Sequence, residues 1–401
     1  METLKFLMTT DTYPPYSNGG DANHVFLLSH ELADKGHEVH VVSNLDAYSL
    51  LSKRYNWKPN RPEKNGTRVS TSFLNSPRGG LEPLLTYVFG ASRFYSGEYE
   101  RILDKIRPDV VHHHDVTFLG HDFFKRRGDY KQLYTAHNYW LVCPNRESFR
   151  FGKVCQGPSL CSLCLLCSGR MPQVWRWRKS GSDITRDIDA IIAPSEYVKQ
   201  RLGSRLNKRI ICLPNFIPAS GEGIRPPGYA DYFLYVGQLE ERKGIMNLLE
   251  TFRNRSSEIN ASLIIVGSGS LEPRINLFIK KNRMEKKVLL LGRVDREMLR
   301  SLYSGALALV VPSVWPENNP LVALEALSAG TPVIGTDAGG LGEIIRKVDA
   351  KLIFRSDGFE EIRTILENKG SYPRDRIKEI FARWYLPERY LAEYEKLLER
   401  I

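Results

Sequence analysis

The sequence predicts an α/β protein with two doubly wound domains, for three reasons. Short runs of Val, Ile and Leu alternate with amphipathic helical stretches, a pattern typical of parallel sheets covered on both faces. The alternation occurs in two separate series, which indicates two such sheets. A length of 401 residues exceeds what one ordinary hydrophobic core needs, so size also favours two domains.

Each series begins with a short apolar strand. The first opens with LKFLMTT at residues 4–10, followed by a Gly-bearing loop and a helix expected over residues 24–36. The second opens after a Pro- and Gly-rich linker at residues 213–231. Nearly every strand ends in a small or polar residue, and ligands of open α/β sheets bind outside those ends. The remaining strands are expected at residues 37–44, 108–114, 132–137 and 190–195, then at 232–238, 261–270, 287–294, 307–313 and 331–340.

The composition is that of a soluble globular chain, with 42% hydrophobic and 26% charged residues. No apolar run approaches the roughly 18 residues of a membrane span, and no secretory signal is visible, so we expect a cytoplasmic protein. The net charge is +11, and cations gather in the first half. Residues 123–180 hold eleven Lys and Arg against two acids, and residues 53–78 hold seven against one. These stretches are either a solvated surface or a face for an anionic partner.

The stretch PSVWPENNPLVALEALSAGTPVIGTDAGG carries the most specific chemistry. We expect a helix that begins near Pro320, with Asn318 or Asn319 as its cap. Glu325 would be a carboxylate in an apolar helix, costly to bury unless donors such as ribose hydroxyls meet it. Glu317 precedes the helix, whose free N–H groups suit an anion such as a phosphate. The alternative is a helix-dipole charge at Glu317 and an exposed Glu325.

These residues carry a family resemblance. Glu317, seven residues and Glu325, continuing as EALSAGTPVIGTDAGGLGEI, resemble the Glu-x7-Glu signature of retaining glycosyltransferases of family 4, which have the GT-B fold. The resemblance implies two Rossmann-like domains that face each other across a cleft. Matching motifs run along nearly the whole chain in the family's order: SNGGDANHVFLLSHELADKGHEVHVVS, IIAPSEYVKQRL, LPNFIP, YVGQLEERKGIMNLLE, IIVGSGS and LLLGRV.

The resemblance also implies the donor-site residues. Glu325 would hold the ribose of a sugar nucleotide, and Glu317 would contact the donor sugar. Lys243 matches the family's diphosphate-binding lysine. Gln238 stands where the family usually has Arg, and Arg242 would replace that charge. The other implied residues are Gly19 and Gly20 beside the phosphate or acceptor, His137 beside the donor sugar, the backbone of Asn319, Pro320 and Leu321 at the diphosphate or sugar, and that of Gly292 to Val294 at the nucleobase.

The implied reaction moves a sugar from a UDP- or GDP-sugar to a glycan or lipid-linked acceptor, with no cofactor for catalysis. The family's mechanism implies retention, by attack from the leaving-group face. Lys243, Arg242 and a helix N-terminus would stabilise the departing diphosphate. Another GT-B enzyme is the main alternative, either a sugar phosphorylase or a nucleotide-sugar epimerase. A nucleic-acid-binding protein, using the basic segment, is the least favoured.

The acceptor is expected to be anionic or membrane-associated. Trp175 and Trp177 lie among the cations of the first half, and Trp with Arg suits a membrane interface. We therefore expect peripheral contact with anionic lipid on the inner face of the cell membrane. We place the acceptor domain at residues 1–216 and the donor domain at 217–382. A final helix at 383–401 is expected to pack back on the acceptor domain, as the resemblance implies.

Five of the six cysteines lie within residues 143–170, which we interpret as an insertion in the acceptor domain. Four thiolates can close a tetrahedral Zn²⁺ site. A subset of the resembled family has similarly spaced cysteines, which implies a structural zinc clip that influences acceptor choice. An iron–sulfur cluster or free thiols are the alternatives. The expected ligands are Cys143, Cys155, Cys161 and Cys164, with Cys167 as an alternative fourth.

Overall fold

The structure is a computed structural model with two compact units. The first unit comprises Met1–Arg150, Cys155–Pro214 and Tyr390–Ile401, and the second Phe151–Val154 and Asn215–Arg389. The basic stretch at 53–78 and the linker at 213–231 lie partly outside the described residues. The structure describes residues 3–17, 19–55, 59, 69–150, 152–158, 160–219, 221, 228–355, 357–368 and 370–401.

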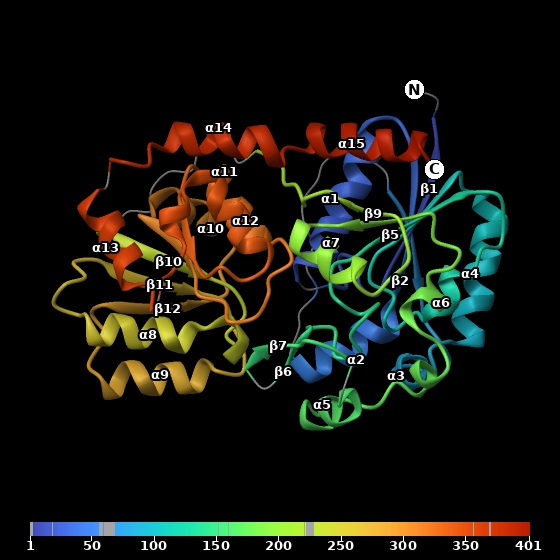
Figure 1. Cartoon of the computed structure of the whole chain (residues 1–401), viewed down its shortest axis with the longest axis horizontal. Helices are drawn as coiled ribbons and strands as arrows, with labels where there is room; N and C mark the ends of the chain where they lie inside the picture. Colours follow the sequence, from blue (N-terminus) through green and yellow to red (C-terminus); the bar gives the residue numbers. More distant parts are fainter. Residues whose placement is uncertain are drawn as a thin grey trace. The chain divides into compact units, whose positions relative to one another are not determined.

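The first unit is built on a seven-stranded sheet in which neighbouring strands run parallel (Figure 1). The strand order is β3-β2-β1-β4-β5-β8-β9. Strands β1 to β3 are added toward one edge of the sheet and β4 to β9 toward the other, so the order of addition reverses between β1 and β4. Side chains at the carboxyl ends of these two strands therefore border a typical ligand position. The strands are β1 (Lys5–Thr10), β2 (Glu38–Asn44), β3 (Ser70–Leu74), β4 (Val110–His113), β5 (Lys131–Thr135), β8 (Ala190–Ala193) and β9 (Ile210–Cys212).

Helices and one short strand complete the first unit. The first helix begins at Gly20, four residues before the expected start, because Gly19 adopts a φ of +100° and turns the chain directly into it. The elements are α1 (Gly20–Asp34), α2 (Leu45–Tyr55), α3 (Leu81–Phe89), α4 (Arg93–Ile106), η1 (His121–Phe124), β6 (Phe149–Arg150), α5 (Cys161–Cys167), η2 (Val174–Trp177), α6 (Gly181–Ile184), α7 (Glu196–Gly203) and, from Tyr390 onward, α15 (Pro387–Glu399). The short strand β7 (Lys153–Val154) falls among the residues of the second unit.

The second unit has a five-stranded parallel sheet of order β12-β11-β10-β13-β14. The strands are β10 (Tyr232–Val236), β11 (Ser262–Val266), β12 (Val288–Gly292), β13 (Ala308–Val311) and β14 (Val333–Gly335). Its helices are η3 (Glu241–Lys243), α8 (Ile245–Asn254), α9 (Glu272–Lys281), α10 (Arg296–Gly305), α11 (Leu321–Ser328), α12 (Gly340–Val348), η4 (Ala350–Leu352), α13 (Phe359–Glu367) and α14 (Arg374–Tyr385). The prediction of an α/β protein with two Rossmann-like units is confirmed.

The C-terminal helix differs from the one expected at residues 383–401. α14 ends at Tyr385, Leu386 is extended, and α15 begins at Pro387. A proline cannot continue the preceding helix but suits the first turn of a new one. α15 buries Tyr394 in the first unit, where its hydroxyl lies 3.0 Å from Nδ1 of His112 on β4. None of the described helices is both long and apolar enough to cross a membrane.

Candidate functional site

Glu317 lies in the loop between β13 and α11, and one of its carboxylate oxygens receives three hydrogen bonds. The donors to Oε1 are Lys243 Nζ at 2.7 Å, Ser313 Oγ at 2.5 Å and Trp315 Nε1 at 2.9 Å. Burial would raise the pKa of Glu317, but Lys243 and these hydrogen bonds outweigh it and hold the pKa below its usual value. Glu317 is therefore an ionised acceptor at neutral pH.

Lys243 reaches Glu317 because two loops meet at a glycine. Gly244, between η3 and α8, has a φ of +71°. A Cβ there would lie 1.9 Å from the carbonyl oxygen of Pro312, which only glycine avoids. A second glycine fixes the backbone of the same loop, since Gly340 N, the first of α12, donates to the carbonyl of Glu317 at 2.7 Å. The carboxylate is thus held through both its side chain and its backbone.

Arg242 lies beside this pair and is oriented by its neighbours. Its Nη2 donates to Gln238 Oε1 at 2.8 Å, and its Nε donates to Glu240 Oε2 at 2.7 Å. The guanidinium carbon is 4.6 Å from the centroid of the Trp315 ring, and Nζ of Lys243 is 5.2 Å from it. Gln238 therefore accepts a hydrogen bond from Arg242 at the position where a cation was expected.

Glu325 lies on α11 and is half-buried. The hydroxyl of Tyr303, on α10, donates to its Oε2 at 2.8 Å. Burial raises the pKa of Glu325, and the Tyr303 bond offsets this only in part. A further donor, such as a ribose hydroxyl, would favour the ionised form. The structure therefore places Glu325 in a partly desolvated environment, not on an exposed stripe.

The N-terminus of α11 differs from the expected capping arrangement. Pro320 occupies the N-cap with no side-chain cap, and the helix begins at Leu321. The expectation that Asn318 or Asn319 caps it is wrong, because Pro320 itself takes the extended cap conformation. The carbonyl of Asn319 instead accepts a hydrogen bond from Asn215 Nδ2 at 3.0 Å. The uncapped first turn suits an anionic group.

The backbone expected at the nucleobase follows β12. Gly292 has a φ of +69°, and its carbonyl accepts a hydrogen bond from Gly267 N at 2.8 Å. The next residue, Arg293, donates from Nε to Ser268 Oγ at 2.9 Å. Val294 is half-buried. The loops after β11 and β12 are thus joined to each other.

Gly19, Gly20 and His137 belong to the first unit. His137 follows β5, and its Nε2 lies 2.9 Å from Nδ1 of His114 at the end of β4. Four buried imidazoles pack together here and form the histidine cluster: His24, His112, His114 and His137.

Burial lowers the pKa of all four imidazoles of the histidine cluster, that of His137 to about 4. His137 is therefore neutral at physiological pH. It can exchange hydrogen bonds with a sugar but carries no charge toward a phosphate.

The structure also has an ion pair at the same sheet edge that the sequence did not predict. Arg146, from the cysteine-rich segment, donates through Nη2 to Asp115 at the end of β4. Asp11, after β1, accepts from the N–H groups of Phe118 and Leu119 at 2.9 and 3.1 Å. Burial raises the pKa of Asp11, and the Asp115 charge raises it further. Acidic residues that follow two strands could have indicated this site from the sequence. The arginine could not be predicted, because it comes from an irregular loop.

Three further residues of the second unit were also missed by the sequence reasoning. Ser313 and Trp315 follow β13 and donate to Glu317, whereas Tyr303 lies on α10 and donates to Glu325. Ser313 ends an expected strand, so its position was a usable signal. Tyr303 is 22 residues from Glu325 in the sequence, and nothing there indicated the contact.

The cysteine-rich segment lies within the described residues except for two positions, 151 and 159. No group of three or more His, Cys, Asp or Glu in the described chain could hold a metal ion. The thiols of Cys155 and Cys161 donate to nearby backbone carbonyls at 3.0 and 2.8 Å. Burial raises the pKa of the Cys161 thiol, and Cys143, Cys155 and Cys164 raise it further. Zinc stays a prediction.

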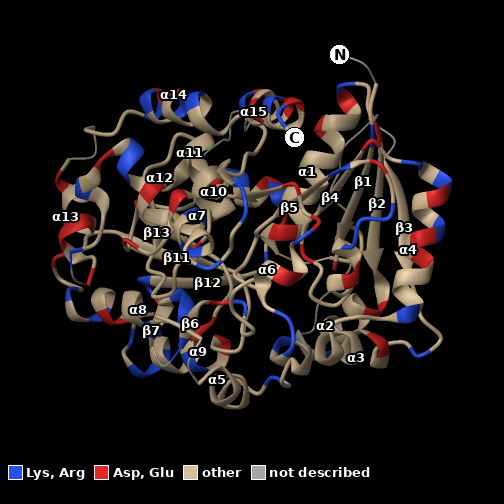
Figure 2. Ribbon diagram, turned by 45° about the vertical axis from the view of Figure 1, so that its right-hand side comes forward, with Lys and Arg blue, Asp and Glu red and all other residues tan. Residues whose placement is uncertain are grey.

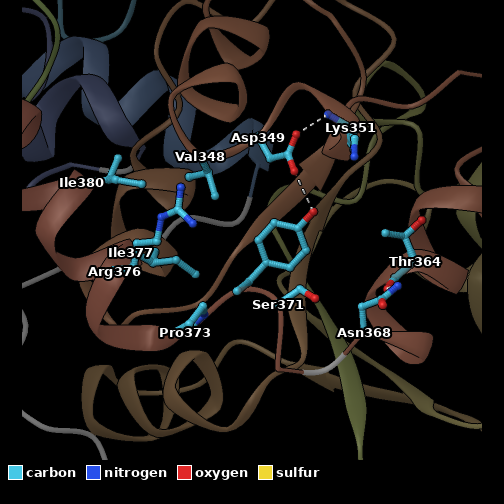
Figure 3. Close-up of a pocket in the computed structure, with 11 residues that line it drawn as sticks. Val348, Asp349, Lys351, Thr364, Asn368, Ser371, Pro373, Arg376, Ile377 and Ile380 are labelled. Atoms are coloured by element: carbon cyan, nitrogen blue, oxygen red, sulfur yellow. Dashed lines mark hydrogen bonds between the residues drawn. The ribbon is translucent and has the colours of Figure 1, made fainter.

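A hollow of about 280 Å³ lies in the second unit beside the end of α12, α13 and α14 (Figure 3). There Asp349 accepts hydrogen bonds from the Tyr372 hydroxyl at 3.0 Å and from the Lys351 N–H at 2.9 Å. None of the expected site residues lines it. It is therefore separate from the Glu317 loop.

Comparisons with known proteins agree with this fold. The family model for glycosyl transferases group 1 matches residues 223–380, and the model for glycosyltransferase family 4 matches residues 18–220, about half of the chain. The structure is similar to a sucrose-phosphate synthase from Thermosynechococcus elongatus, with a TM-score of 0.71, 18% identity and coverage of 99% of this chain and 98% of that one. It is also similar to HepE from Anabaena in complex with UDP, with a TM-score of 0.66, 14% identity and coverage of 99% and 100%.

Two curated relatives match most of the sequence. An uncharacterized glycosyltransferase of Methanocaldococcus jannaschii is 27% identical over 86% of this chain and 83% of its own. A glycogen synthase of Mycobacterium tuberculosis is 28% identical over 85% and 80%. Fold and motifs thus define a glycosyltransferase of the GT-B class. The chain belongs to glycosyltransferase family 4.

Proposed function

We propose that this glycosyltransferase moves a sugar from a UDP- or GDP-sugar to a glycan or lipid-linked acceptor, with retention of configuration. The observation that carries the proposal is the ion pair between half-buried Lys243 and buried Glu317, with Arg242 alongside. Cations next to an ionised carboxylate suit a ligand that has both a diphosphate and sugar hydroxyls. Solved structures of the same fold contain UDP, one of them with glucose, which supports this donor class.

The proposed step breaks the bond between the sugar C1 and the diphosphate oxygen. Negative charge develops on the diphosphate, where Lys243, Arg242 and the first turn of α11 would stabilise it. The acceptor hydroxyl attacks C1 from the face that the diphosphate leaves, which retains the configuration. Its proton passes to the departing phosphate oxygen, so no protein base is required.

Glu317 would bind the donor sugar as an acceptor of hydrogen bonds. Its lowered pKa keeps it ionised, so it is poorly suited to act as a general acid. Lys243 Nζ, 2.7 Å away, would lie between this carboxylate and the diphosphate charge. The neutral His137 would donate or accept at a sugar hydroxyl.

Replacing Glu325 with alanine tests the ribose assignment. Loss of hydrogen bonds to a charged carboxylate is expected to weaken sugar-nucleotide binding by about thirtyfold. Thermal shift with UDP- and GDP-sugars measures this, because ligand that binds the native state raises the unfolding temperature. The control is Glu361→Ala, which removes a more deeply buried carboxylate of the same unit. If Glu325→Ala shifts as much as wild type with every sugar nucleotide, the assignment fails.

The same screen separates the alternatives. Sugar phosphates that raise the unfolding temperature, while sugar nucleotides do not, would favour a phosphorylase. Binding of oligonucleotides that weakens steeply with salt would favour a nucleic-acid-binding protein. Hydrolysis of one sugar nucleotide, with release of its sugar, supports the transferase and identifies the base and the sugar.

We also propose a structural zinc held by Cys143, Cys155, Cys161 and Cys164. Their spacing in the sequence supports it. Purified protein is expected to contain about one zinc per chain, and Cys161→Ser should remove it and lower the unfolding temperature. Cys212→Ser, on β9, should keep the metal. Protein with neither zinc nor iron would reject the proposal, and iron would indicate a cluster instead.

A further inference from the structure

Exposed apolar side chains concentrate on one part of the first unit. Seven of the ten large apolar side chains that are exposed in the described chain lie between residues 81 and 177, so this is not the ordinary scatter of a protein surface. We name them the apolar patch: Leu81, Phe89, Leu160, Leu163, Leu166, Met171 and Trp177.

Helix α5 supplies the centre of the apolar patch. Leu163 and Leu166 are three residues apart and therefore lie along one side of the helix, and Leu160 precedes it as the N-cap. Cys164 and Leu165 are buried on the opposite side. Figure 2 shows α5 without a charged residue. The helix is thus anchored by one face and presents leucines on the other.

The three segments that carry the apolar patch meet at one turn of the cysteine-rich segment. The carbonyl of Pro144 accepts hydrogen bonds from the Tyr87 hydroxyl of α3 at 3.5 Å and from Gln173, just before η2, at 3.4 Å. The adjacent Asn145 donates from Nδ2 toward Cys164 Sγ of α5 at 3.8 Å. Figures 1 and 2 both draw α3 and α5 at the same end of the first unit. The three segments that carry the patch are therefore neighbours on the first unit.

The stretch that carries five of the seven patch side chains is basic, although one of its cations, Arg170, pairs with Glu147. Residues 160–180 contain four cations and no acid. Arg176 packs over Trp175, with its guanidinium carbon 4.3 Å from the ring centroid. Arg178 and Lys179 are exposed beside Trp177, whose side chain is 76% exposed. Leucines, an exposed Trp and flanking cations are the combination that inserts into a bilayer interface with anionic headgroups.

We propose that the apolar patch docks this protein on an anionic lipid bilayer, with the leucines of α5 and Trp177 entering the interface. A lipid surface supplies both the apolar medium and the negative charge that this surface lacks. The proposal does not depend on glycosyl transfer, because none of these side chains belongs to the proposed donor site. A protein partner or a second copy of the chain is the competing occupant.

Vesicle co-sedimentation of the full chain tests the proposal. Wild type is expected to sediment with vesicles of equal parts phosphatidylcholine and phosphatidylglycerol, and less as salt rises. The double variant Leu163→Ser/Leu166→Ser should bind at least about tenfold more weakly. Leu277→Ser, on α9, is the matched control, because Leu277 and Leu166 are both 67% exposed. Arg178→Glu/Lys179→Glu should reduce the preference for the anionic lipid.

Several outcomes would overturn the proposal. Wild type that stays in the supernatant with these vesicles rejects it, as does equal loss of binding in Leu277→Ser. A lipid-free dimer that the leucine variant dissociates, without vesicle binding by wild type, assigns the surface to self-association. Sugar-nucleotide hydrolysis in vesicle-free solution should match wild type in the leucine variant, which separates failure of this proposal from failure of the proposed activity. If the double variant does not fold, Trp177→Ser replaces it.

Discussion

Replacing Lys243 with alanine is expected to lower kcat/KM for the sugar nucleotide by about a thousandfold. The ammonium would neutralise diphosphate charge as the sugar bond breaks, and it also balances the buried carboxylate of Glu317. Without it, burial would raise the pKa of Glu317 and weaken its bonds to the sugar. Initial rates of donor hydrolysis and transfer measure the loss.

A second lysine–glutamate pair provides the control for this substitution. Lys35 and Glu395 of the first unit are also 2.7 Å apart but lie near the surface. Lys35→Ala should leave kcat/KM unchanged, since exposed pairs contribute little and this one is remote from the proposed chemistry. Lys243→Arg, which keeps the charge, should recover part of the activity. A kcat/KM for Lys243→Ala within a few-fold of wild type would contradict the proposed role.

Acid is expected to destabilise the first unit through the histidine cluster, beginning below about pH 6.5. Burial lowers the pKa of these imidazoles in the folded state, so the unfolded chain binds protons first as the pH falls. Stability present at neutral pH is therefore lost progressively toward pH 4. For His137, whose pKa falls to about 4, the loss is about 3 kcal/mol.

Thermal unfolding at a series of pH values between 7 and 4 checks this expectation. His137→Asn cannot take up that proton, so its stability should fall less steeply over the same range. His40 provides a comparison, because it lies half-buried on β2, outside the histidine cluster, and burial lowers its pKa as well. A wild-type midpoint that stays constant from pH 7 to pH 5, or an unchanged slope in His137→Asn, would contradict the argument.

Local patterns in the sequence determined the fold class and several features of the donor site. Runs of Val, Ile and Leu bounded by Gly and Ser predict buried parallel strands, because this pattern involves only residues that are adjacent in the sequence. Neighbouring residues also predict that Glu317 precedes a helix and that Glu325 lies within it. Local signals failed where the chain is irregular. β3 follows a polar stretch and was not expected, and the cap of α11 was assigned to an asparagine in place of Pro320.

Contacts between distant residues were decided only by the tertiary structure. Lys243 and Glu317 are 74 residues apart in the chain, and their contact depends on strand order and on the close approach of Gly244 to Pro312. Tyr303, the partner of Glu325, could not be predicted for the same reason. Which leucines of α5 face solvent likewise depends on what its other face packs against. Sequence periodicity encodes which residues prefer burial, whereas which groups meet is set by packing of the whole unit.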